Sequence, residues 1–589
     1  MNVIKSDIVV VGGGGAGLRA AIAINEADPK LTVALVSKVV PMRSHTVAAE
    51  GGAAAVIRAD DSLDNHFDDT VSGGDWLCDQ DAVQYFIEHC TEEMVQLEHW
   101  GCPWSRKDDG SVNVRFFGGM KVQRTWFAGD KSGFHMLHTL FQTSFKYPGI
   151  QRYDEFFVAD LIVEDGRARG VLAIEIATGE MYLFDCKAVI LCTGGAGRVY
   201  RKNTNAGIVT GDGMGLAYRH GVALRDMEFV QYHPTALPAT GILITEGCRG
   251  EGAILTNKNG YRYLQDYGMG PLDPWPRPKA MELGPRDRLS QAFWHEEQKG
   301  NTIDTPEGPV VHLDLRHLGE KKILERLPLI TEVARTFAGI DPVTQPIPVR
   351  PVVHYTMGGV ASNVSTGTSM PGLYVAGECS SVGIHGANRL GSNSLAEIVV
   401  FGRVAGEHAA AYARTVPDSD GSAIRRQAEA SAARLEALLQ CESGERVATL
   451  RNEMGDAMET GVGIFRQASG MRTACDKVAE LRDRYRRGIK LDDKNRAFNT
   501  EWLSAIELGF MLEVAETMAH SAYLRKESRG AHVRLDEYTT RDDDNFLQHT
   551  LATYAGDGPP KISYAPVVIT KSQPRIRSYG GAGQQAVLT

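Results

Sequence analysis

The feature that most constrains the fold is a glycine-rich turn between a short apolar run and a helical pattern near the N-terminus. Residues 7–27 read DIVVVGGGGAGLRAAIAINEA, and LTVALVSK follows over residues 31–38. The first run is short, continuous and rich in valine, as expected of a strand that is buried on both faces of a parallel sheet. The order strand, glycine-rich turn, helix, strand predicts the nucleotide-binding half of a Rossmann-like α/β fold.

The glycines of this turn have the spacing of a dinucleotide-binding motif. Gly12 allows the tight turn, Gly14 lets the backbone approach a pyrophosphate, and Gly17 lets helix and strand pack closely. The pyrophosphate would lie at the N-terminus of the helix, where free N–H groups favour negative charge. The second strand ends in Ser37 and Lys38 instead of the acidic residue that usually holds a ribose hydroxyl of NAD. This ending leaves FAD as the favoured dinucleotide.

Two later segments fit the same sheet, and their separation predicts an inserted domain. KAVILCTGGAGR (187–198) and GLYVAGECSS (372–381) are short apolar strands that end in small residues. They lie about 180 residues apart, which is too far for one crossover connection. We therefore expect a discontinuous FAD-binding domain (1–234 and 352–415), an inserted α+β capping domain (235–351), a helical domain (416–540) and a small C-terminal region (541–589). The C-terminal region contains a strand-like APVVIT (565–570) and a loose glycine-rich tail.

Composition excludes several classes of protein. The formal net charge is -10, and no Lys/Arg cluster with interleaved aromatic residues is present, so no nucleic-acid partner is expected. Nine cysteines without a CxxC pair argue against a disulfide framework, an iron–sulfur cluster or a zinc site, and they favour a reducing compartment. We expect no metal site, no signal peptide and no membrane-spanning helix, because no apolar stretch reaches 18 residues.

Six polar clusters place arginine or histidine beside small residues. They are MRSHTVAAEGG (42–52), QYHPT (231–235), TEGCRGEG (245–252), ELGPRD (282–287), HYTMGG (354–359) and HGANRLGSNSLAE (385–397). Each one alone is compatible with an ordinary loop, an ion pair or a helix cap, such as Thr245. Together they supply the cations and hydrogen-bond donors that a small dianion requires, and arginine grips a carboxylate with two parallel bonds.

In combination, these motifs resemble the flavoprotein family of fumarate reductases and succinate dehydrogenases. The resemblance runs from the N-terminal strand through RKESRGAHVRLDEYTTRDDDNFLQHT (525–549). It implies an oxidoreductase acting on CH–CH groups, which interconverts fumarate and succinate by hydride transfer from FAD N5. It also implies an iron–sulfur subunit, a membrane anchor that exchanges electrons with quinone, and an assembly factor that attaches the flavin. The chain would then lie on the cytoplasmic face of the inner membrane, attached through its partners, in anaerobic respiration.

The resemblance also implies roles for individual residues. His45, in RSHT, would carry a covalent bond to the 8α-methylene of FAD. The dicarboxylate would be held by His233, Thr245, His354 and Arg389. Arg286 would deliver the proton, Glu246 and Arg249 would return it, and His233 would also take part in catalysis. The remaining FAD-binding positions would be Gly12, Gly13, Gly14, Gly15, Ala16, Ser37, Lys38, Ser44, Thr46, Glu50, Gly51, Gly52, Asp212, Tyr355, Glu378, Arg389, Ser394 and Leu395.

Three alternatives stay open at this point. Succinate dehydrogenase runs the same chemistry in reverse; overall similarity favours fumarate reductase, as does Glu50, whose carboxylate would shift the flavin potential. L-aspartate oxidase holds FAD without a covalent bond and lacks the histidine of RSHT, so His45 argues against it. A non-enzymatic scaffold has no need to bury so many charges. Cys248, beside several cations, could be a reactive thiol of lowered pKa or a buried small residue.

Overall fold

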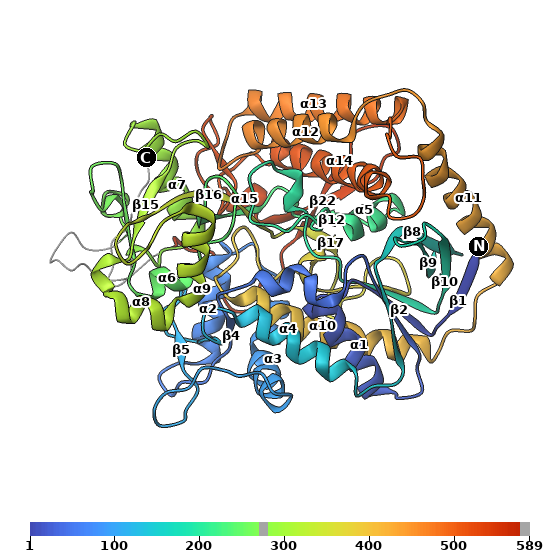
Figure 1. Ribbon diagram of the computed structural model, residues 1–589, viewed down its shortest axis with the longest axis horizontal. Coiled ribbons are helices and arrows are strands. Elements are labelled where there is room, and N and C mark those ends of the chain that lie inside the picture. The colour runs from blue at the N-terminus through green and yellow to red at the C-terminus, as the bar shows by residue number, and fades with distance from the viewer. Residues whose placement is uncertain (270–280, 578–589) are drawn as a thin grey trace.

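The computed structural model describes residues 1–269 and 281–577 (Figure 1). The glycine-rich tail expected at the C-terminus begins where this description ends. In the described part of the chain, no helix is both long and apolar enough to cross a membrane.

The FAD-binding half is built on a five-stranded parallel sheet. Its strand order is β18 (Leu373–Val375), β11 (Ala188–Leu191), β2 (Ile8–Val11), β3 (Val33–Ser37) and β7 (Ile150–Asp154). Every residue of β2 and β3 is buried, which explains why their sequences are continuous apolar runs. The two segments that are far apart in sequence, β11 and β18, are neighbours, as the sequence predicted.

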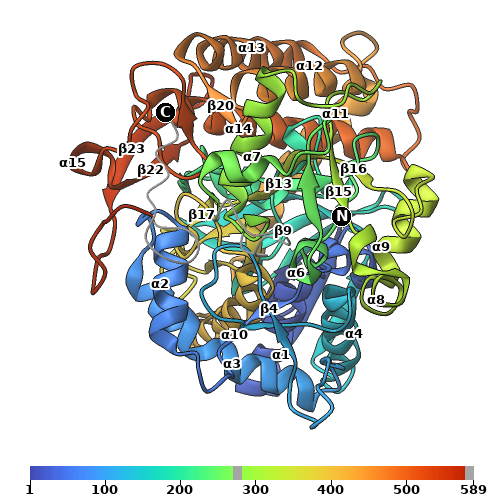
Figure 2. The same ribbon diagram turned by 90° about the vertical axis from the view of Figure 1, so that its left-hand side faces the viewer.

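One face of this sheet is covered by two helices in close contact, α1 (Gly15–Ala27) and α10 (Asn393–Ala413) (Figures 1 and 2). Their backbones approach because glycines of α10 face small residues of α1. A Cβ atom at Gly402 would lie 2.8 Å from the carbonyl oxygen of Ala16, and one at Gly406 would lie 2.4 Å from that of Ala20. This contact joins the first glycine-rich turn to the last of the six polar clusters.

The insertion between the two parts of the FAD-binding half has its own sheet and core. Its antiparallel sheet has the order β13 (Val230–Ala236), β16 (Ile347–Thr356), β15 (Val311–Asp314) and β14 (Ile254–Thr256). Its helices are α6 (Glu246–Glu251), α7 (Arg286–Gln298), α8 (Glu320–Arg326) and α9 (Pro328–Val333). A separate hydrophobic cluster is built from residues between Leu237 and Val349. The paired strands β13 and β16 carry the chain into this unit and out of it, and we call residues 235–351 the lid.

A helical segment follows and packs over the FAD-binding half (Figure 2). It contains α11 (Gly421–Gln440), α12 (Val447–Gly461), α13 (Ala468–Arg487) and α14 (Thr500–Leu524). Helix α14 is apolar on almost all sides, and it is buried against α12, α13 and α5 (Asp212–Arg219), as expected of such a helix. The α/β class with an inserted unit and a following helical region is therefore confirmed.

The C-terminal strand prediction was wrong in position. The hairpin β22 (Gln548–Thr553) and β23 (Lys561–Pro566) joins a sheet with β12 (Leu224–Arg225), and β23 ends at Pro566, inside APVVIT. Proline has no N–H to donate to a ladder. The residues after it bind side chains of the FAD-binding half instead: the N–H of Val568 donates to Asp79 Oδ1 (2.9 Å), and that of Thr570 to Gln80 Oε1 (3.1 Å).

Candidate active site

A cavity of about 950 Å³ lies between the glycine-rich turn of the FAD-binding half and the lid. All the residues that the sequence nominated for cofactor, substrate or proton transfer line this cavity, with the exception of Arg249. Segments more than 300 residues apart in sequence are thereby brought to one place. The FAD-binding and substrate-binding positions form one continuous space.

The glycine-rich turn has room and donors for a pyrophosphate. A Cβ atom at Gly12 would lie 2.2 Å from the carbonyl oxygen of Cys192, and one at Gly17 would lie 1.8 Å from that of Gly12, so both positions require glycine. The N-cap of α1, Gly14, supplies no side-chain acceptor, although Thr46 Oγ1 accepts from the N–H of Gly15 (3.1 Å), and the buried hydroxyl of Ser44 has no hydrogen-bond partner among the described residues. These groups fit a dinucleotide such as FAD.

Lys38 and Asp212 at one end of the cavity form an ion pair with each other. Lys38 Nζ lies 2.6 Å from Asp212 Oδ2 and 2.8 Å from Glu507 Oε1, which belongs to α14. Although burial alone would lower it, the two carboxylates raise the pKa of Lys38 above its ordinary value. Sequence reasoning missed Glu507, because nothing in the local pattern of α14 marks it as a partner of this end of the cavity.

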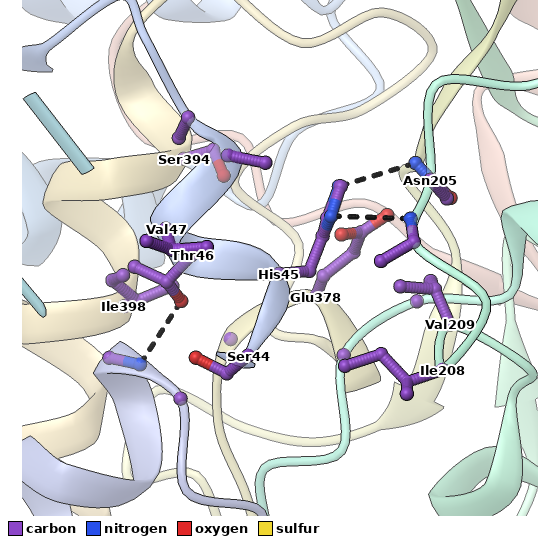
Figure 3. Close-up of a pocket in the computed structure, with 18 of the residues that line it drawn as sticks. Ser44, His45, Thr46, Val47, Asn205, Ile208, Val209, Glu378, Ser394 and Ile398 are labelled. Carbon is purple, nitrogen blue, oxygen red and sulfur yellow. Dashed lines mark hydrogen bonds between the residues drawn. The ribbon is translucent and has the colours of Figure 1, made fainter. Parts of the chain in front are cut away.

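His45 faces the cavity from a short 3-10 helix, His45–Ala48, and lies against Asn205 and the backbone of Ala206 (Figure 3). The N–H of Ala206 lies 3.4 Å from His45 Nδ1, and the amide of Asn205 lies 3.5 Å from Nε2. Burial lowers the pKa of His45 to about 4, so the ring is neutral at physiological pH. A neutral imidazole is the form that can act as a nucleophile.

Two histidines lie side by side in the substrate end of the cavity. The rings of His233 and His354 are 5.0 Å apart between centroids. His233 Nδ1 lies 3.0 Å from the carbonyl oxygen of Thr235, and His354 Nδ1 lies 2.7 Å from Thr204 Oγ1. Burial, and after it the charge of Arg286, lowers the pKa of both rings well below the ordinary value. Both are therefore neutral hydrogen-bonding groups.

An arginine–glutamate–arginine chain runs from the cavity into the lid. Arg286 Nε lies 2.9 Å from Glu246 Oε2, and Arg249 Nη2 lies 3.7 Å from the same oxygen. The other carboxylate oxygen of Glu246 accepts from the backbone N–H of Gly118. Burial alone would raise the pKa of Glu246, yet the two arginines hold it below its ordinary value. The helix-cap interpretation of Thr245 also holds, because its hydroxyl accepts from the N–H of Gly247 (3.2 Å) at the start of α6.

Arg389 lies close to Arg286, because both arginines donate to Gln231 Oε1. Its guanidinium carbon is 4.1 Å from the ring centroid of Tyr355, whose hydroxyl donates to Glu397 Oε2 (2.8 Å). Burial, followed by the charge of Arg286, lowers the pKa of Arg389 to about 10, so it remains cationic at neutral pH. Glu378 accepts from the N–H of Thr356 (2.9 Å), and burial raises its pKa to about 7.

Burial bears on two single residues that the sequence singled out. Cys248 is fully buried, and burial raises the pKa of its thiol, an effect that outweighs the attraction of Arg249 and Arg115. The reactive-thiol interpretation therefore fails, and Cys248 is a buried small residue. Burial and the neighbouring Asp130 raise the pKa of Glu50 well above its ordinary value, so it gives up its proton less readily than the exposed carboxylate of the same residue type would.

Sequence reasoning also missed two residues that organise the cavity. Arg115 donates to the carbonyl oxygen of Gly51 (2.6 Å) and lies over the ring of Phe127 (4.3 Å), which braces the loop after His45. Gln231 lies between Arg286 and Arg389. The motif QYHPT contained Gln231, but the pattern gave it no role. Arg115 has no motif around it.

Comparisons with known proteins agree with this site. A family model described as FAD binding domain matches residues 7–395, and one described as fumarate reductase flavoprotein C-term matches residues 451–579. The fumarate reductase flavoprotein subunit of Proteus vulgaris is 63% identical over 584 residues, covering 99% of this chain and 98% of the relative. That of Escherichia coli K12 is 61% identical over 589 residues, covering 100% and 98%. A succinate dehydrogenase flavoprotein subunit from Rickettsia bellii is 40% identical over 595 residues, covering 98% and 97%.

Solved structures give the same result. The flavoprotein chain of E. coli quinol fumarate reductase, solved as a variant, superposes with a TM-score of 0.97 at 61% identity, covering 99% of this chain and 100% of that chain. A quinol–fumarate reductase solved with menaquinol superposes with a TM-score of 0.95, covering 98% and 100%. The chain therefore belongs to the fumarate reductase flavoprotein family and is an FAD-binding protein.

Proposed function

We propose that this chain is the flavoprotein subunit of a quinol-linked fumarate reductase that interconverts fumarate and succinate. The observation that carries the proposal is the buried chain Arg286–Glu246–Arg249, which ends in the same cavity as His354 and Arg389. Its closest functional alternative, succinate dehydrogenase, uses the same chemistry. The relatives named fumarate reductase are 61–63% identical, whereas the succinate dehydrogenase relative is 40% identical.

Neutral donors and cations in the cavity suit a dicarboxylate. Arg389 binds one carboxylate, and His354 and Thr245 donate hydrogen bonds around the substrate. His233 donates from Nε2 in the tautomer whose Nδ1 accepts from the N–H of Thr235 (3.3 Å). Arg389, His233 and Thr245 are buried and His354 is half-buried, so little water competes for the carboxylates. The same groups polarise the double bond by withdrawing charge toward one carboxylate, which prepares the far carbon to accept a hydride.

FAD, when bound, supplies the hydride, and His45 is its point of covalent attachment. The neutral ring of His45 and its place on the cavity wall support this assignment. The tether fixes the position of the flavin against the substrate and makes the flavin a better electron acceptor. The other FAD-binding positions act largely through the backbone of residues 12–16 and 50–52, and Ser394 and Leu395 lie at the first turn of α10.

Arg286 delivers a proton to the second alkene carbon. Arginine is an unusual acid, because its pKa lies far above neutrality. The transfer is feasible here because Glu246 lies between the two arginines: the ionised carboxylate takes a proton from Arg249 and passes it to Arg286 as Arg286 gives its own proton to the substrate, and Arg249 then regains a proton from solvent. The lid excludes water while this exchange takes place.

Partner subunits would carry the electrons. Relatives of this chain are subunits of quinol fumarate reductase. By analogy, we assign an iron–sulfur subunit, an anchor that exchanges electrons with quinone, and peripheral attachment to the cytoplasmic face of the inner membrane. An assembly factor that attaches the flavin belongs to the same proposal.

The test is a denaturing gel of the purified chain, read for flavin fluorescence after acid treatment, beside His45→Ser. A fluorescent band near 64 kDa that is lost in the variant supports the covalent tether. An unlabelled band from a yellow, folded sample contradicts it and favours a relative that holds FAD without a bond. Fumarate reduction by Arg286→Gln at the wild-type rate would sink the assignment of the proton donor.

A further inference from the structure

Gln231 is the one side chain that contacts both arginines of the substrate cavity among the described residues. Its Oε1 accepts from Arg286 Nη1 (3.0 Å) and from Arg389 Nη2 (3.1 Å). Its Nε2 donates to Asn388 Oδ1 (3.0 Å) and to the carbonyl oxygen of Arg389 (2.8 Å). The side chain is completely buried, and these four contacts use all of its ordinary hydrogen-bonding capacity.

The orientation of this amide is fixed by its neighbours. Guanidinium groups only donate, so the atom that faces Arg286 and Arg389 must be the oxygen. The atom that faces two carbonyl oxygens must be the nitrogen. Gln231 lies on β13 next to an irregularity in the pairing with β16, between Gln231 and Tyr232, which places it at the edge of the lid. Its partners Asn388 and Arg389 belong to the FAD-binding half, whereas Arg286 belongs to the lid.

A neutral acceptor at this point has a physical advantage over a charged one. Arg286 and Arg389 repel each other, and the charge of Arg286 contributes to the lowered pKa of Arg389. A shared carbonyl oxygen holds both groups in place and leaves both positive charges available to a dianion. A carboxylate would also hold them, but it would compete with the substrate for the same two cations.

We propose that Gln231 is a positioning residue that sets the distance between the proton-donating Arg286 and the carboxylate-binding Arg389. This inference rests on the proposed function. Through Arg286, it places the acid over the substrate. Through Arg389, it sets where the carboxylate lies. Its contribution is geometric, because it leaves the charge of the cavity unchanged.

Two substitutions separate position from charge. Gln231→Leu removes the acceptor and leaves a guanidinium N–H of each arginine unpaired. We expect kcat for fumarate to fall about 100-fold, the cost of misplacing a reacting group by about 1 Å, with KM changing less than tenfold because Arg389 keeps its contact with Tyr355. Gln231→Glu keeps an acceptor for the two arginines but adds a negative charge; like Gln231→Leu, it loses the N–H groups that donate to Asn388 and to the carbonyl oxygen of Arg389. We expect KM to rise at least tenfold, and kcat to fall less than in Gln231→Leu.

The assay uses the flavin-loaded chain with a reduced dye as the electron donor. Binding of malonate, a dicarboxylate that cannot be reduced, is read separately from the change in flavin absorbance. Gln265→Leu is the matched control, because Gln265 is a buried glutamine of the lid that does not line the cavity. Flavin content and gel fluorescence should be unchanged in all three variants.

We expect Gln231→Leu to lower mainly kcat and Gln231→Glu to raise mainly KM. Malonate should bind more weakly in the variant whose KM rises. Three results overturn the proposal: Gln231→Leu within twofold of wild type, equal impairment in Gln231→Leu and Gln231→Glu, or loss of flavin from either one. A wild-type chain that does not reduce fumarate would refute the proposed function, and this outcome is distinct from a failure of the Gln231 variants.

Discussion

Asp130 joins the lid to the FAD-binding half, and its removal should loosen the closed lid. Its Oδ2 accepts from the backbone N–H of Leu329 (2.7 Å) and of Ile330 (3.4 Å), at the start of α9 in the lid. Asp130 itself is 2% exposed and lies before α4 (Ser132–Ser144) in the FAD-binding half. Leu329 lines the cavity, so this contact holds the lid closed at the cavity wall.

The magnitude follows from the two N–H groups that lose their acceptor. Replacing an acidic residue that caps a helix start with alanine costs up to about 2 kcal/mol. Since 1.36 kcal/mol is a factor of ten, Asp130→Ala should shift the equilibrium between closed and open lid about 30-fold toward open. Asp130→Asn, which keeps an acceptor, is therefore expected to close almost normally.

The assay compares steady-state fumarate reduction with limited proteolysis of the lid. Asp130→Ala should raise KM, lower kcat and speed cleavage within residues 235–351, and added malonate should restore protection. Asp130→Asn should behave as wild type in each measurement. Equal kinetics and equal cleavage in Asp130→Ala and wild type would refute the reasoning, as would an Asp130→Asn variant as impaired as the alanine variant.

Three further predictions concern single ionisable groups. Burial alone would lower the pKa of His549, but two carboxylates raise it from 6.5 to about 9. His549→Gln should therefore lower the free energy of unfolding in urea by roughly 2–3 kcal/mol at pH 7, and this difference should disappear as the pH rises past about 9. Cys248 should resist iodoacetamide in the native protein, where Cys441 is the one cysteine that is not fully buried, so mass spectrometry that finds native Cys248 labelling contradicts the pKa argument. Because burial raises the pKa of Glu50, Glu50→Gln should shift the flavin midpoint potential at pH 7 by less than about 30 mV, and a larger shift would mean that the group is ionised.

The fold was predictable where local patterns determine it. The strand, glycine turn and helix over residues 7–27 follow from one steric requirement: a Cβ at Gly12 or Gly17 would overlap a backbone oxygen. The insertion followed from the distance along the chain between β11 and β18. The strand predicted for residues 565–570 does not continue past Pro566. The N–H of Val568 binds Asp79 instead, and the local sequence does not encode this long-range contact.

The sequence predicted which residues line the site better than it predicted their pKa values and ion-pair partners. The motif around Cys248 indicated nearby cations correctly, but the pKa depends on burial, which the motif does not reveal. The raised pKa of Glu50 likewise depends on burial. Lys38 lies in a recognisable position, yet its partner Glu507 comes from a helix with no motif. Residue types at fixed spacing predict which groups lie together in the folded chain. Their pKa values depend on how far the fold excludes water from them, and burial is known only from the folded structure.

The division of the cavity between its two walls links lid closure to proton transfer. Arg286, Glu246 and Arg249 all lie within the lid, whereas His354 and Arg389 enter from the FAD-binding half or its border. The proton chain meets the other half at two points: the N–H of Gly118 donates to Glu246, and Gln231, at the edge of the lid, joins Arg286 to Arg389. An open lid would break the contact at Gly118 and move the acid away from a carboxylate that stays bound. Substrate can thus bind before the acid is in place, and the acid is aligned only when water has been excluded, so a weakened lid contact should lower turnover more than it lowers binding.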